Sequence, residues 1–123
     1  MKNELSVALV CEDMLFRDLL RQVLQDRGYT VIGDYSTLKN LVETLGRVPD
    51  LLVFEVDSHH PASVEEQIRH VRASVPGTRT AVLVQADDVD SQIASVRAEA
   101  DGVIRKDVTV QSFIDNLALM ASG

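Results

Sequence analysis

A chain of 123 residues has the length of a single domain. Hydrophobic residues make up 46% of it and charged residues 25%, which excludes a disordered or membrane-embedded chain. A net charge of −7 disfavours direct contact with nucleic acid, because a phosphate backbone needs a basic surface. The single cysteine, Cys11, cannot form an internal disulfide, which fits a reducing compartment. The first apolar run, residues 5–10, is far too short for a signal peptide or a membrane span, so we expect a cytoplasmic protein that does not associate with membranes.

Five short apolar runs recur along the chain, at residues 5–10, 30–32, 51–54, 81–84 and 102–104. Each run is nearly continuous and lacks the alternation of polar and apolar residues that marks a sheet with one wet face. Strands of this kind are typical of a parallel sheet that helices cover on both sides.

Stretches with helical spacing of apolar residues follow each run, and Gly or Pro ends the first three of them. The apolar positions of the five predicted helices are Leu15, Phe16, Leu19, Leu20, Val23 and Leu24; Leu38, Leu41, Val42 and Leu45; Val64, Ile68, Val71 and Val75; Ile93 and Val96; and Phe113, Ile114, Leu117 and Met120. Five strand–helix units predict one α/β domain over residues 1–123, with a doubly wound five-stranded parallel sheet.

Polar residues follow four of the predicted strands, at the edge where such a sheet places its chemistry. They are Glu12 and Asp13 after the first strand, Glu55 and Asp57 after the third, Gln85 after the fourth and Lys106 after the fifth. Together with residues 12–17, 31–34 and 100–102, this set resembles the CheY-like receiver domain of two-component response regulators. It is most similar to receivers that precede a LuxR-type helix-turn-helix module.

This resemblance implies a flavodoxin-like sheet of strand order 2-1-3-4-5 and a role in phosphorelay signal transduction and transcription regulation. In that family an acidic pair and an Asp on the third strand hold a divalent cation, and the same Asp accepts a phosphoryl group. The resemblance assigns the acidic pair to Glu12 and Asp13, and the conserved-type lysine to Lys106. No cofactor is required, although Mg²⁺ could bind Glu12, Asp13 and Glu55.

Two counts place the acceptor differently. Counting from Pro49 gives Glu55, whereas counting back from Pro61 gives Asp57. If Asp57 were the acceptor, Glu55 would lie deeper with an unpaired carboxylate, which is costly to bury. We therefore favour Glu55, with Asp57 as the alternative, and expect Glu55 to pair with Lys106.

The switch positions also depart from the family. Gln85 stands where a Ser or Thr reads the phosphoryl group, and Val103 replaces an aromatic residue. We expect an atypical receiver, or pseudo-receiver, that is not an enzyme and acts as an interaction or dimerisation module without phosphorylation. One alternative is a receiver phosphorylated on Asp57 with Mg²⁺, and another is a pseudo-receiver that senses a small ligand.

A protein partner or a second copy is expected on one of two faces. One comprises the fourth helix, fifth strand and fifth helix, and the other the first and fifth helices. A sensor kinase is a further candidate partner. We expect Cys11 to be buried and His59 and His60 to face water rather than a metal. Whether a DNA-binding module follows residue 123 stays open.

Overall fold

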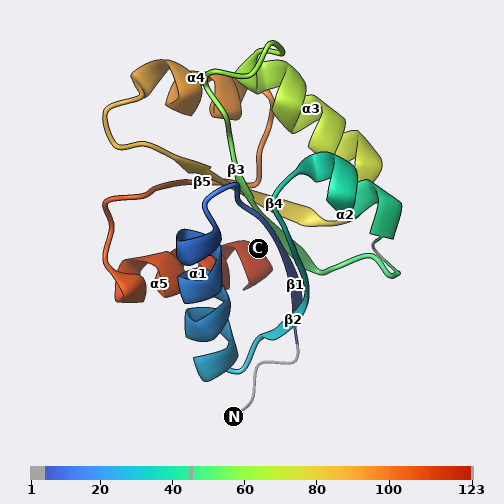
Figure 1. Ribbon diagram of the computed structural model, residues 1–123. Coiled ribbons are helices and arrows are strands. Elements are labelled where there is room, and N and C mark those ends of the chain that lie inside the picture. Colours follow the sequence, from blue (N-terminus) through green and yellow to red (C-terminus); the bar gives the residue numbers. More distant parts are fainter. Residues whose placement is uncertain (1–4, 45, 123) are drawn as a thin grey trace.

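The computed structural model describes residues 5–44 and 46–122, and their strands form one parallel sheet of order β2-β1-β3-β4-β5 (Figure 1). The strands are β1 (Ser6–Val10), β2 (Thr30–Tyr35), β3 (Leu51–Glu55), β4 (Arg79–Val84) and β5 (Gly102–Arg105). The helices are α1 (Met14–Asp26), α2 (Leu38–Thr44), α3 (Val64–Ser74), α4 (Val89–Arg97) and α5 (Val110–Ser122). The predicted fold class and strand order are confirmed. No helix within the described ranges has the length and apolar character needed to cross a membrane.

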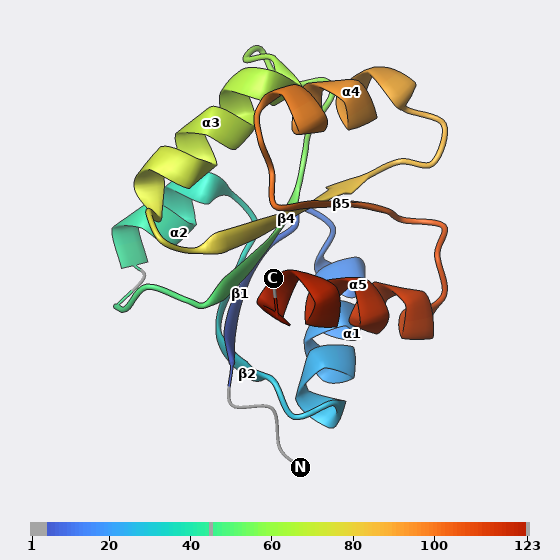
Figure 2. The same ribbon diagram turned by 180° about the vertical axis from the view of Figure 1, so that it is seen from behind.

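Helices cover both faces of the sheet, with α1 and α5 on one side and α2, α3 and α4 on the other (Figures 1 and 2). Each side has its own apolar core. Side chains of alternate strand positions enter one core or the other, as the period of two in a strand requires. The core under α1 and α5 contains Val7 and Leu9 of β1, and that under α2, α3 and α4 contains Ala8 and Val10.

Local signals set the limits of the helices. Asp13 and Ser63 cap the first turns of α1 and α3 by accepting hydrogen bonds from backbone N–H groups three residues on. Gly28 and Gly77 adopt φ of +86° after α1 and α3, a backbone conformation that favours glycine. The ends of α1 and α3 therefore lie close to where the sequence predicts.

Strand β2 continues to Tyr35, beyond the apolar run at residues 30–32. Gly33 and Asp34 interrupt the apolar run from which the strand was predicted. β2 is an edge strand whose side chains are mostly half-buried, so it tolerates these residues.

The predicted buried face of α1 is confirmed at Leu20 and Leu24 but wrong at Leu15 and Leu19, which are exposed. Val42 of α2, also predicted to be buried, is exposed. In α4, Ile93 and Val96 point to solvent. The predictions for α3 and α5 are confirmed by the buried side chains Ile68, Val71, Val75, Phe113, Ile114 and Leu117. Leu45 lies outside the described residues.

Candidate functional site at the carboxyl edge of the sheet

The central feature of this edge is an ion pair between the ends of two strands. Glu55 ends β3, and Lys106 follows β5, where its backbone N–H donates to the Val84 carbonyl. Lys106 Nζ donates to Glu55 Oε2 at 2.5 Å, and the two side chains are only 20% and 14% exposed. The expected pairing of these residues is present in the structure. It joins the two charges of opposite sign that the third and fifth strands bring to this edge.

Phe16 of α1 covers the lysine. The Lys106 ammonium lies 4.4 Å from the centroid of the Phe16 ring, which is cation–π distance. The ammonium thus contacts a carboxylate and an aromatic face, so the charge of Lys106 is already compensated inside the protein.

Cys11 is a residue of this edge that sequence reasoning assigned only to the core. Its side chain is fully buried, as predicted, and shares the α1 and α5 side with Val7 and Leu9. Burial, and after it the charge of Glu55, raises the pKa of the Cys11 thiol to about 12. The signal that could have placed Cys11 here is parity, because it stands two residues beyond Leu9 on the inward face of β1. The inward side chain at the end of β1 is therefore a neutral thiol, and a carboxylate at this position would face the site.

The acidic pair has other roles in this structure. Glu12 is exposed and makes no hydrogen bond or ion pair with any described residue. Asp13 is also exposed, and its Oδ1 accepts the Phe16 backbone N–H at 3.1 Å as the N-cap of α1. The structure therefore does not gather Glu12, Asp13 and Glu55 around one point.

Arg17 fixes the chain just before this pair. Its guanidinium is buried, donates to the Cys11 carbonyl at 2.8 Å and lies 3.3 Å from Asp34 of β2. Arg21 also pairs with Asp34, at 2.7 Å. Asp34 thus tethers α1 to β2, and Arg17 holds the end of β1 in place.

Asp57 belongs to the loop between β3 and α3. Its Oδ1 accepts the His59 backbone N–H at 2.9 Å, the local turn that Asp side chains often form. The Gln67 side chain bonds both the backbone N–H and the carbonyl of Asp57. Asp57 therefore organises the loop, while Glu55 is the carboxylate that contacts Lys106.

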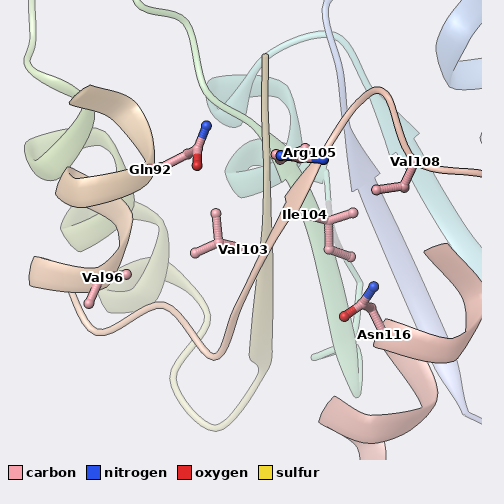
Figure 3. A pocket seen from close by; sticks show the side chains of 7 residues that line it. All are labelled: Gln92, Val96, Val103, Ile104, Arg105, Val108 and Asn116. Atoms are coloured by element: carbon pink, nitrogen blue, oxygen red, sulfur yellow. The ribbon is translucent and has the colours of Figure 1, made fainter. Parts of the chain in front are cut away.

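The two predicted switch positions, Gln85 and Val103, have different surroundings. Gln85 is exposed after β4, and its carbonyl accepts the Asp88 N–H at 3.1 Å. Val103 points from β5 towards α4, into a cavity with a volume of about 350 Å³ that Gln92 and Val96 also line (Figure 3). An amide fills the first position and an aliphatic group the second, and neither offers a hydroxyl.

The donor set does not fit a divalent cation. Across residues 5–44 and 46–122, His, Cys, Asp and Glu side chains nowhere form a group of three that could hold a metal ion. Mg²⁺ prefers several carboxylate and water oxygens, whereas Glu55 is engaged by Lys106 and Cys11 is a neutral thiol. His59 and His60 are exposed on the loop, with His60 Nδ1 accepting the Ala62 N–H.

The fold matches solved receiver domains. A response regulator from Thermotoga maritima is 23% identical, with a TM-score of 0.80, and 98% of this chain and 100% of that chain are covered. A CheY-like receiver domain protein from Methanospirillum hungatei is 18% identical, with a TM-score of 0.80 and coverage of 98% and 95%. A LuxR-family regulator from Aurantimonas is 18% identical, with a TM-score of 0.83, and 98% of this chain and 87% of that chain are covered.

Sequence comparison adds nothing to this likeness, since neither a family model nor a curated protein matches the chain. The structural likeness defines the class of fold. The chain has the CheY-like fold of response regulator receiver domains, including those of LuxR-family regulators.

Proposed function

We propose that this chain is an atypical receiver domain, a cytoplasmic module of two-component-type signalling and transcriptional control that acts without phosphorylation. The observation that carries the proposal is the pairing of Lys106 with Glu55 at 2.5 Å. In a site that accepts a phosphoryl group, the strand-three carboxylate and the lysine both need to be available, and here they bind each other.

The chemistry of phosphoryl transfer supports this conclusion. Transfer requires a nucleophile, a cation that neutralises the phosphoryl oxygens, and a positive group beside them. Here the lysine charge is already neutralised by Glu55, and the inward residue directly after β1, Cys11, is an uncharged thiol. The Glu55 carboxylate also reaches one methylene further than an Asp would, into the space above the strand end. The module is therefore not an enzyme, and neither Mg²⁺ nor another cofactor takes part.

A module that does not switch by phosphorylation must act through its surface. Both faces that the sequence indicated carry exposed apolar side chains, which mark interaction surfaces when they cluster. On α1 these are Met14, Leu15 and Leu19, and on α5 they are Val110 and Leu119. The proposed partner is a protein or a second copy, bound at the α4–β5–α5 face or the α1–α5 face.

Incubation with acetyl phosphate and Mg²⁺, followed by intact mass measurement, tests the proposal. A competent receiver treated in parallel shows that the reagent is active. We expect no added phosphoryl group on this chain. A gain of one phosphoryl group that disappears in Asp57→Asn would establish the alternative acceptor, and a gain that disappears in Glu55→Gln would show that the ion pair opens.

A further inference from the structure

A groove with a volume of about 650 Å³ lies between α3 and α4, which are neighbours on one face of the sheet (Figures 1 and 2). One wall is the side of α4 that carries Asp90, Ala94 and Arg97. The other wall is formed by residues 63–65 around the start of α3 and by Ser58 of the loop before it. The cavity beside β5 shares none of these residues, so this α3–α4 groove is a separate feature of the surface.

Two of the four charged side chains that line the groove are already engaged. Glu65 of α3 lies 3.6 Å from Arg69 in an ion pair along the same helix. The carboxylate of Asp88 caps α4, and it accepts both the backbone N–H of Ser91 at 3.0 Å and the hydroxyl of Ser91 at 2.6 Å. These two carboxylates therefore have partners within the chain and are less available to a ligand.

The other two charged side chains, Asp90 and Arg97, are exposed and form no hydrogen bond or ion pair with any described residue. They lie seven residues apart, hence on one side of α4 and about 10 Å apart along its axis. This exceeds the screening length of about 8 Å at physiological salt, so the two charges compensate each other little. The groove therefore has a free carboxylate towards one end of α4 and a free guanidinium towards the other, and the apolar side chains of Val64, Ile93 and Ala94 also line it.

We propose that the α3–α4 groove binds an extended segment of a partner protein with the pattern basic–x–apolar–x–acidic. Alternate side chains of an extended chain point the same way, so all three of these side chains face the groove. Four residues span about 13 Å, and the flexible charged side chains make up the difference from the spacing of Asp90 and Arg97. The basic side chain pairs with Asp90, and the carboxylate pairs with the fork of N–H groups on Arg97. The apolar side chain between them contacts Ile93 and Ala94.

Two features of the groove favour an extended segment over a helix or a small molecule. An extended chain needs hydrogen-bond partners for its backbone, and the wall opposite α4 supplies the hydroxyls of Ser58 and Ser63. The Ser58 hydroxyl is unpaired among the described residues, and Ser63 Oγ accepts the Glu66 N–H at 3.1 Å, which leaves the Ser63 hydroxyl proton to donate. The rim is open, with Ile93 45% exposed, so a small molecule would stay largely in water. This inference rests on the proposed function only in taking the chain to be a module that binds protein.

NMR titration with the peptide acetyl-Ser-Lys-Thr-Leu-Thr-Glu-Ser-amide tests the groove. We expect saturable shifts of the backbone amides of Glu65, Asp90, Ala94 and Arg97. Arg97→Glu should raise the dissociation constant about fivefold, because an attractive pair becomes a repulsive one. The matched control, Arg47→Glu, makes the same change of charge at an exposed residue that does not line the groove, and should have no effect.

A second peptide, with Lys in place of its Glu, tests the charge pairing. It should bind the wild type about fivefold more weakly than the first peptide, because its second Lys meets the Arg97 guanidinium. In Arg97→Glu the order of the two peptides should reverse, so that the second binds more tightly. A general attraction of basic peptides to an acidic chain would instead favour the second peptide in both proteins.

Three results would overturn this site. The first is the absence of saturable shifts at several millimolar peptide, and the second is a set of shifts that lies outside the groove. The third is a preference for one peptide that stays the same in the wild type and in Arg97→Glu. None of these results bears on whether acetyl phosphate modifies the chain, so the two proposals fail separately.

Discussion

The Lys106 side chain connects three elements, because it follows β5, pairs with Glu55 of β3 and lies beneath Phe16 of α1. The sequence predicted the pair, since the carboxyl ends of parallel strands meet at one edge of the sheet. It did not predict the aromatic cover, because apolar spacing places Phe16 on the inward side of α1 without specifying which side chain it contacts. It also left Cys11 out of the site, although strand parity places the thiol on the inward face.

Replacing Lys106 by Met should lower the free energy of unfolding by about 1–3 kcal/mol, because a largely buried Glu55 carboxylate then loses its partner. The control is Arg69→Met, whose ion pair with Glu65 is exposed, and it should change stability by less than about 0.5 kcal/mol. The double change Lys106→Met with Glu55→Leu should recover most of the loss. Urea denaturation measures all three, and equal small effects for Lys106 and Arg69 would contradict a buried pair.

Stability should depend on Cys11 in alkaline solution. The folded chain raises the thiol pKa from 9.0 to about 12, so between these values the unfolded state loses the proton first. The stabilisation is complete below pH 9 and is lost as the pH rises towards 12. In Cys11→Ala this contribution is absent, so the free energy of unfolding should fall less steeply above pH 9. Parallel pH profiles for the two proteins would show that the thiol is not shielded.

At the level of helices and strands, apolar spacing predicted which segments are helical better than which side they bury. In α1 the apolar residues are too numerous for one face, so Leu20 and Leu24 enter the core while Leu15 and Leu19 do not. In α4 the small residues Ser91 and Ser95 face inward, whereas its large apolar side chains face solvent. This reverses the usual pattern, in which a helix buries its large apolar side chains. A hydrophobicity pattern alone cannot anticipate such a reversal, because it depends on the space left by α3 and the sheet.

The N-cap of α1, Asp13, should contribute to the stability of the protein. Asp13→Ala should destabilise the protein by about 1 kcal/mol, because the Phe16 N–H loses its acceptor. Asp18→Ala alters an exposed carboxylate within the same helix, 3.9 Å from Arg21, and should cost less than about 0.5 kcal/mol. Thermal denaturation compares the two. If Asp13→Ala were no worse than Asp18→Ala, the capping role of Asp13 would be refuted.

For the whole molecule, five apolar runs and the helices between them were sufficient to predict the α/β class, because strands covered on both faces have few polar positions. The strand order β2-β1-β3-β4-β5 followed from the resemblance to receivers, not from spacing. The site was only partly predictable. Loop residues such as Asp57 take their positions from local hydrogen bonds, for example those with Gln67, that no periodicity encodes.

We infer that the charges at the carboxyl edge of the sheet compensate one another and leave no place there for a divalent cation. NMR titration with Mg²⁺, following the backbone amides of Cys11, Glu12, Asp13 and Glu55, tests it most directly. The positive control is the double variant Cys11→Asp with Glu55→Asp, which restores an inward carboxylate beside a shorter one. We expect saturable shifts in that variant and none in the wild type up to several millimolar Mg²⁺. Saturable shifts of these amides in the wild type would contradict it.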